Sequence, residues 1–502
     1  MKIDFSATKP INECNEHLVA VGSFADGGLS EGGKLLDKAL NGLIAKSIQS
    51  QDLKGKIDKL INLKSPEGVP FYEVTLFGMG ETTNSQLDYE KVGAKLGTSL
   101  AALADRLSFS EVFAVVDLRG VNAGFVSLIA NGLRLSSWNF DKYFTTEKTK
   151  PKRKLKGVNF LCDNPDAVRS LYKPLELVTN GVFLTREVVS EVPNVLYPET
   201  FAKIARKELE PLGATVEVLN EEDMASLGMN SLLAVGQGSE KESKLCVIRW
   251  LGADDTNAAP IAFVGKGVTF DTGGISIKPA NNMHEMKYDM AGGGAVLGVM
   301  KALAGRKAKV NAVGVIGLVE NMPSGSAQRP GDVVKSMSGQ TIECLNTDAE
   351  GRMVLADALW YTQDRFSPKF MVNLATLTGA ITVALGQEHA GLFSNNDKLS
   401  DELTDSGKLS GDNLWRMPMG DAYDKAINST VADMKNIGDP GTGGSITAAQ
   451  FLQRHVNGLP WAHLDIAGMA WADKSRSLCN KGASGFGVRL LDTLVATYYE
   501  DK

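Results

Sequence analysis

Charged residues gather in two glycine-rich segments whose flanks are otherwise apolar. In the segment 261–298 they include Lys266, Asp271, Lys278 and Asp289. In the segment 345–359 they include Asp348, Glu350 and Arg352. Taken singly, each is better explained by a surface ion pair or a glycine turn, because charged side chains are common on protein surfaces. Their concentration in two segments of this kind favours one shared site.

Four carboxylates cannot lie together without counter-charge, because like charges repel strongly when they leave water. Divalent ions supply such charge, and an oxygen-rich donor set with one amine suits manganese, magnesium or zinc. Two ions ~3.5–4 Å apart can activate water and stabilise a developing oxyanion. Lys278 and Arg352 would add positive charge near that oxyanion. The pattern predicts two-metal hydrolysis through an oxyanion; a two-metal phosphoesterase is one option, which the lack of histidine ligands makes less well supported.

The second part of the chain supplies the elements that must position these residues. Strands are expected at 244–252, 260–265, 310–319, 369–377 and 461–468, and helices at 293–305, 351–364, 446–457 and 487–500. Buried strands that alternate with helices are typical of a largely parallel sheet covered by helices. Ligands gather at the carboxyl ends of the strands in such sheets, and both charged segments lie at such ends.

The first third of the chain has the same α/β character on a smaller scale. Strands are expected at 17–24, 70–78 and 112–118, and helices at 32–46 and 89–107. A helical pattern follows, and Pro174 is expected to interrupt or kink it. We predict an α/β protein of two domains: a smaller N-terminal α/β domain (1–165), a connecting helix (166–192) and a catalytic domain (193–502) with a central, mostly parallel mixed sheet flanked by helices.

Charge and cysteine usage narrow the class of protein. With 53 basic and 59 acidic residues, the net charge of −6 argues against a protein that binds nucleic acid over its whole surface. The run 148–156 is a local exception, for which a solvated linker, a phosphate-binding patch and a DNA-binding role are all open.

The five cysteines, Cys14 among them, form no CxxC pair, and neither a secretory signal nor an apolar run of 18 residues is visible. We expect a cytoplasmic protein that does not enter membranes.

The charged segments also resemble the motifs of the leucine aminopeptidase family, the M17 cytosol aminopeptidases, in their bacterial type. NTDAEGR (346–352) is similar to the family signature, and VGKGVTFDTGGISIKP (264–279) and MKYDM (286–290) match in the same order and spacing. NLATLTGA (373–380), WRMPM (415–419) and WAHLDIAG (461–468) match as well. The likeness is strong over about 190–495, whereas the N-terminal third matches only in length and α/β character. It implies a cytosolic metallo-aminopeptidase that releases leucine and other, mainly apolar, residues from peptides with a free N-terminus.

The resemblance further implies a role for each residue of the site. A tighter metal ion would be held by Lys266, Asp271, Asp289 and Glu350, and a more exchangeable one by Asp271, Asp348 and Glu350. Mn²⁺ or Zn²⁺ is expected, with Mg²⁺ or Co²⁺ as further options. Lys278 and Arg352 would form the catalytic pair, with a bicarbonate ion held at Arg352. The substrate pocket would include Met286, Thr376, Gly379 and Ala467. A homohexamer is implied too.

Overall fold

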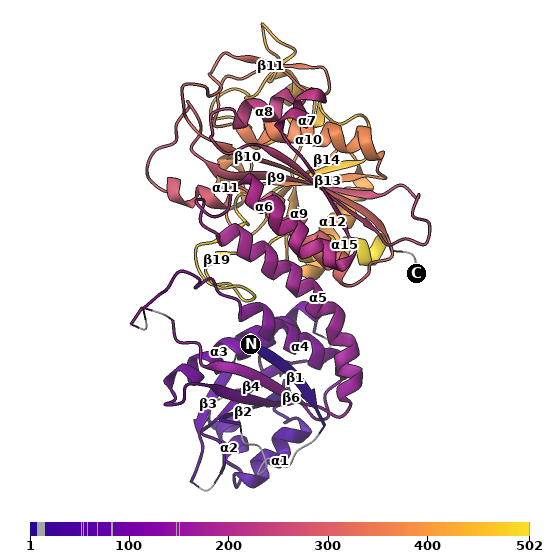
Figure 1. Ribbon diagram of the computed structural model, residues 1–502. Helices are drawn as coiled ribbons and strands as arrows, with labels where there is room; N and C mark the ends of the chain where they lie inside the picture. The colour runs from indigo at the N-terminus through magenta and orange to yellow at the C-terminus, as the bar shows by residue number, and fades with distance from the viewer. Residues whose placement is uncertain are drawn as a thin grey trace. The chain divides into compact units, whose positions relative to one another are not determined.

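The computed structural model describes residues 1–7, 16–51, 53, 55–57, 59–67, 69–81, 84–146, 148–149 and 151–500. The chain forms two compact units, Met1–Thr179 with Lys474–Asn480, and Asn180–Asp473 with Lys481–Lys502 (Figure 1). The division falls inside helix α5 (Pro165–Ser190), which covers most of the segment expected to connect the domains. Pro174 does not interrupt this helix, contrary to expectation. A proline removes a single backbone donor, and the turns on either side maintain the helix.

The first unit is built on a six-stranded sheet in the order β1-β6-β5-β2-β4-β3. Its strands are β1 (Lys2–Ser6), β2 (Leu18–Phe24), β3 (Leu60–Lys64), β4 (Glu73–Gly80), β5 (Val112–Asp117) and β6 (Leu155–Leu161). All neighbours are parallel except β3 and β4. One face packs against α3 (Gln86–Arg106) and α4 (Ala123–Ser136), the other against α1 (Glu31–Ala39) and α2 (Leu43–Ser50). The single helix expected at 32–46 is thus two helices, because Asn41 and Gly42 adopt positive φ angles of 54° and 80° and break the helical path.

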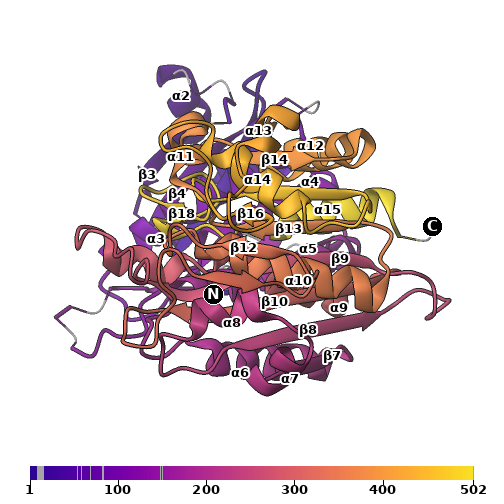
Figure 2. The same cartoon turned by 90° about the horizontal axis from the view of Figure 1, so that it is seen from above.

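The second unit contains an eight-stranded sheet in the order β15-β14-β17-β13-β9-β10-β8-β7. Its strands are β7 (Thr215–Leu219), β8 (Lys244–Leu251), β9 (Ile261–Asp271), β10 (Asn311–Asn321), β13 (Met371–Ala375), β14 (Ala390–Ser394), β15 (Leu414–Arg416) and β17 (Trp461–Asp465). The central strands β17, β13, β9 and β10 are mutually parallel, and antiparallel pairs occur toward both margins. Figure 2 shows β7, β8, β10, β9, β13 and β14 succeeding one another across this unit. The mostly parallel mixed sheet that the sequence predicts is confirmed.

Helices cover both faces of this larger sheet (Figures 1 and 2). One face packs against the end of α5, α6 (Pro198–Leu209), α9 (Ala291–Gly305), α12 (Asp397–Ser410) and α15 (Val488–Tyr498). The other packs against α8 (Asn230–Gly236), α10 (Glu350–Phe366) and α14 (Gly444–Gln453). The smaller elements are α7 (Glu221–Ser226), α11 (Gly379–Leu385), α13 (Asp421–Lys425), β11 (Val333–Lys335), β12 (Thr341–Glu343), β16 (Met434–Lys435), β18 (Trp471–Ala472) and β19 (Gly482–Ala483).

The cysteines that the structure describes are buried, unpaired thiols. Cys162, Cys246, Cys344 and Cys479 are buried and form no disulfide, while Cys14 lies outside the described residues. Among the helices that the structure describes, none combines the length and the apolar character that crossing a membrane requires.

Candidate active site

The site is built at the carboxyl end of β9, where two of the charged residues extend from one strand. Lys266 and Asp271 are five residues apart, so an uninterrupted strand would place them on opposite faces of the sheet. The pairing with β10 shifts between Val268 and Phe270, so that β9 carries one extra residue there. Such a bulge reverses the alternation of side chains beyond it. Lys266 and Asp271 therefore share a face, the one against which α10 packs.

Lys266 lies at the buried centre of the charged cluster. Its Nζ is 2.8 Å from a carboxylate oxygen of Asp289 and 2.8 Å from one of Glu350, and it donates a hydrogen bond to the Thr376 carbonyl oxygen (2.9 Å). Glu350 is the first residue of α10, where the positive end of the helix dipole favours a carboxylate. Gly351 makes room for the lysine, since a Cβ there would lie 2.7 Å from Lys266 Cε.

Lys278 neutralises the other half of the cluster. Its Nζ is 2.8 Å from Asp271 Oδ2 and forms a second ion pair with Asp348. The carboxylates of Asp271, Asp348 and Glu350 each offer an oxygen, and these three oxygens lie within 4.8 Å of one another. Residues from β9 and from the start of α10, about eighty positions apart in sequence, thus meet as the sequence analysis predicts.

Two glycines shape the turn that leads from β9 to Lys278. Gly273 and Gly274 have φ angles of +86° and +66°, a region that side-chain-bearing residues rarely adopt. The Gly273 amide donates to Asp271 Oδ1 (2.9 Å), and Thr347 Oγ1 donates to the Gly273 carbonyl (2.6 Å). A Cβ on Gly273 would also come within 3.0 Å of Asp348 Oδ1. The turn therefore depends on glycine for both its conformation and its closeness to the carboxylates.

Burial and mutual repulsion shift the protonation of the cluster. Burial, reinforced by the charge of Glu350, raises the pKa of Asp271 to about 6, and burial also raises the pKa of Asp289. Burial opposes the charge of Lys266, but the surrounding carboxylates outweigh it and raise the pKa of this amine. Burial likewise opposes the charge of Glu350, yet Lys266 and Lys278 lower its pKa. In the absence of metal ions, the positive charges of Lys266 and Lys278 offset the repulsion among the crowded carboxylates.

The donor set fits divalent cations. Apart from the ion pairs with Lys266 and Lys278, Asp289 Oδ2 and Asp348 Oδ1 are buried oxygens that accept no hydrogen bond from the described residues. Buried oxygens without donors are costly unless a cation or a proton reaches them. Hard divalent ions prefer such carboxylate oxygens. Lys266 could join them as a ligand only after losing its proton.

Arg352 follows two residues after Glu350 on α10 and is buried. Its Nη1 donates to the Asn436 carbonyl (2.7 Å), while its Nε finds no hydrogen-bond partner among the described residues. Burial lowers the pKa of this guanidinium to about 10. A buried cation with an unused donor is suited to holding a small anion such as bicarbonate.

The four residues expected in the substrate pocket relate to the centre in different ways. Thr376 touches it directly, with Oγ1 donating to Asp289 Oδ1 (2.8 Å). Asp465 links the neighbourhoods of Gly379 and Ala467: it accepts from the hydroxyl of Thr378, the residue before Gly379 at the start of α11, at 2.6 Å, and from the Ala467 amide at 3.3 Å. Met286 lies in the 3-10 helix Met283–Tyr288, and its carbonyl accepts from the Asp289 amide (3.3 Å).

Sequence reasoning missed several residues that hold the site in place. Asn321, at the end of β10, donates to Asp271 Oδ1 (2.8 Å) and to the Thr347 carbonyl (3.0 Å). Asn436 accepts from the Leu345 amide (2.8 Å) besides supporting Arg352. Asn321 could have been found as the polar last residue of an apolar strand beside β9. Nothing in the sequence around Asn436, which follows β16, indicates its role.

With this fold and site, the chain belongs to the cytosol aminopeptidase family. Residues 183–492 match the family's catalytic domain and residues 20–147 match its N-terminal domain. The likeness thus extends further into the N-terminal third than the motifs alone indicate. The protein is accordingly an aminopeptidase, a hydrolase of peptides.

Particular relatives are similar over nearly the whole chain. A probable cytosol aminopeptidase of Caulobacter vibrioides is 51% identical over 473 residues, which cover 94% of each chain. One of Ehrlichia ruminantium is 52% identical over 90% of this chain and 89% of its own. Among solved structures, a tomato leucine aminopeptidase variant has a TM-score of 0.84 at 33% identity, covering 99% of this chain and 96% of that one. The bottromycin maturation enzyme BotP in complex with Mn has a TM-score of 0.81 at 28% identity, covering 96% and 99%.

Proposed function

We propose that this aminopeptidase is a cytoplasmic, two-metal enzyme that releases leucine and other, mainly apolar, N-terminal residues from peptides. The observation that carries the proposal is the convergence of three carboxylates within 4.8 Å beside two lysines. That one structural relative was solved in complex with Mn supports manganese as a candidate, and zinc, magnesium and cobalt are chemically compatible.

The ligands of the two ions would divide between the halves of the cluster. Lys266, Asp271, Asp289 and Glu350 would hold one ion, and Asp271, Asp348 and Glu350 the other. When bound, the ions supply Lewis-acid activation of water and of the scissile carbonyl. With the carboxylates neutralised in this way, Lys278 would no longer be needed in its ion pairs with Asp271 and Asp348 and would be available to the substrate.

The freed Lys278 and the buried Arg352 provide the remaining chemistry. Lys278 donates to the carbonyl oxygen as negative charge develops on it, which stabilises the tetrahedral transition state. Arg352 would hold a small anion, bicarbonate, which would supply the general base for hydrolysis. Thr376, Gly379, Ala467 and Met286 line the subsite for the first side chain. The family resemblance also leads us to propose a homohexamer.

The decisive test removes single ligand charges with little change of shape. We expect Asp348→Asn and Glu350→Gln to lose metal and nearly all hydrolysis of leucyl and alanyl reporter substrates, while circular dichroism stays that of the wild type. Asp405→Asn, which alters an exposed carboxylate paired with Lys408, serves as the control. Full metal content with activity within twofold of wild type in either site variant would refute the assignment. Readdition of Mn²⁺, Zn²⁺, Mg²⁺ or Co²⁺ to stripped wild-type enzyme ranks the metals.

A further inference from the structure

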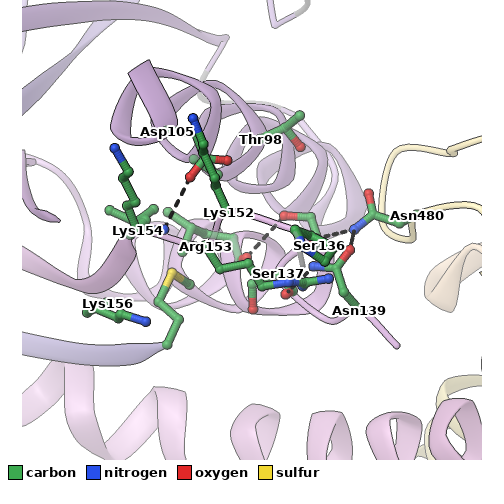
Figure 3. A pocket seen from close by; sticks show the side chains of 16 residues that line it. Thr98, Asp105, Ser136, Ser137, Asn139, Lys152, Arg153, Lys154, Lys156 and Asn480 are labelled. Carbon is green, nitrogen blue, oxygen red and sulfur yellow. Dashed lines mark hydrogen bonds between the residues drawn. The ribbon is translucent and has the colours of Figure 1, made fainter. Parts of the chain in front are cut away.

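The basic run left unexplained by the peptidase chemistry does not form a loose linker. Residues 151–156 line a cavity of about 450 Å³ that lies entirely within the first unit. The other walls come from α3, from the end of α4 and the residues after it, and from Asn480. Figure 3 shows Lys154 and Lys156 toward one end of this pocket and Asn139 and Asn480 toward the other.

Two of the basic residues anchor the run to the wall. The Lys154 backbone amide donates to Asp105 Oδ1 (3.2 Å), and its side chain donates to the Leu107 carbonyl. Arg153 Nε lies 2.6 Å from Asp141 Oδ2. These contacts fix the backbone of the run. Lys152 and Lys156 are therefore held at the pocket wall by an ordered segment.

The cations that remain are not neutralised by the protein. Lys152 and Lys156 are exposed at the pocket, and neither has an ion-pair partner within the part of the chain that the structure describes. The side chains that line the pocket carry four positive charges, on Lys152, Arg153, Lys154 and Lys156, against the single negative charge of Asp105, and only Arg153 has a further carboxylate partner, Asp141, outside the lining. In a protein with a net charge of −6, this is a local reversal of sign.

The rest of the pocket combines apolar surface with polar side chains, among them Thr98, Ser137 and Asn480. Gly97, Ala101, Leu133 and Leu155 contribute apolar surface. The Asn480 side-chain amide donates to the carbonyls of Ser136 (3.2 Å) and Trp138 (3.1 Å) and to Asn139 Oδ1 (2.9 Å), which fastens the segment Lys474–Asn480 to this wall. A cationic rim beside an apolar floor suits an anion attached to an organic body.

We propose that this pocket binds a small phosphorylated molecule, with its phosphate groups against Lys152 and Lys156 and its organic body on the apolar floor. The volume falls within the range of ~300–1,000 Å³ usual for small-molecule sites and exceeds what a lone phosphate fills. A concave pocket of this volume favours a small molecule over a nucleic-acid strand, which needs an extended basic surface.

Calorimetric titration of the full-length, metal-loaded enzyme tests the proposal. The probes are ADP, pyrophosphate and adenosine, in buffer with excess Mg²⁺ so that ADP does not strip the active-site ions. We expect ADP to bind once per chain, pyrophosphate to bind more weakly and adenosine not to bind. Lys152→Gln and Lys156→Gln should each weaken ADP about tenfold, the usual effect of losing one charge-assisted contact.

Two further variants separate the pocket from the run as a whole. Asp105→Asn keeps an acceptor for the Lys154 amide but removes the one negative charge, so it should tighten ADP binding. Lys148→Gln alters an exposed lysine of the same run that is not among the pocket residues and should leave ADP binding unchanged. Arg352→Ala removes the anion position of the active site and should also leave it unchanged.

Several results would overturn the proposal. Equal weakening by Lys148→Gln would mean that the run attracts anions as a polyelectrolyte, and loss of ADP binding in Arg352→Ala would place ADP in the active site. Tighter binding of a single-stranded oligonucleotide that displaces ADP and depends on Lys152 and Lys156 would make the patch a nucleic-acid surface. If ADP does not bind at millimolar concentration while peptidase activity is normal, the assignment of this pocket to a phosphorylated ligand is refuted. The proposed peptidase function would be unaffected by that result.

Discussion

Gly351→Ala should damage the active site while leaving the fold intact. Gly351 is the second residue of α10, where alanine is conformationally acceptable and favoured over glycine by up to ~1 kcal/mol. The added Cβ would lie 2.7 Å from Lys266 Cδ and Cε and 2.9 Å from Nζ. Carbon atoms pack best at about 3.5–4.0 Å, so the end of the lysine must move by roughly 1 Å. That end is flexible, which keeps the cost to stability small, but it carries the nitrogen that contacts Asp289 and Glu350.

A displacement of about 1 Å in a catalytic arrangement costs on the order of 10²-fold in rate, or about 2.7 kcal/mol of transition-state stabilisation. We therefore expect kcat/KM on a leucyl reporter to fall about a hundredfold, with lower metal content by mass spectrometry and a stability within ~1 kcal/mol of wild type. Gly444→Ala, at the start of α14, is the control, because its Cβ would meet only Ala380 at an ordinary 3.4 Å. Wild-type kcat/KM with full metal in Gly351→Ala would show that the position of Lys266 is not critical.

Three further outcomes are expected. Arg352→Ala should slow turnover by ~10²–10⁴-fold without abolishing it, because Arg352 holds the base and is not itself the base; an unchanged rate in bicarbonate-free buffer would contradict this role. Lys266 keeps its proton in the metal-free centre, since the carboxylates raise its pKa, so metal occupancy and rate should both rise from about pH 6 toward mildly alkaline pH, and Lys266→Met should bind less metal; an optimum near pH 6 would contradict the ligand role. Burial lowers the pKa of His455 to about 4, so the unfolded chain takes up its proton first as the pH falls below about 6.5. Between about pH 6.5 and about 4 the enzyme should lose on the order of 3 kcal/mol of stability through this group, and a denaturant series at several pH values should show a shallower loss in His455→Leu.

Local sequence determined which residues form the centre. The motifs around Lys266, Asp271, Asp289 and Glu350 combine unusual residue types with glycines at fixed positions, and the apolar strands beside them predict the α/β sheet and the end of it where the site lies. These features are local because chain spacing, side-chain type and glycine conformational freedom act over a few residues.

Tertiary structure decided what these residues contact. The bulge in β9 that turns Lys266 and Asp271 to one face depends on pairing with β10 and is invisible in a single strand. Arg352 donates to the carbonyl of Asn436, 84 residues away. No local sequence pattern indicates which carbonyl a buried guanidinium will contact, so only the folded structure identifies this partner. The run 151–156 shows the same limit: its charge was evident from composition, whereas its place on the wall of a pocket follows from packing against α3 and α4, since long-range contacts depend on the whole fold.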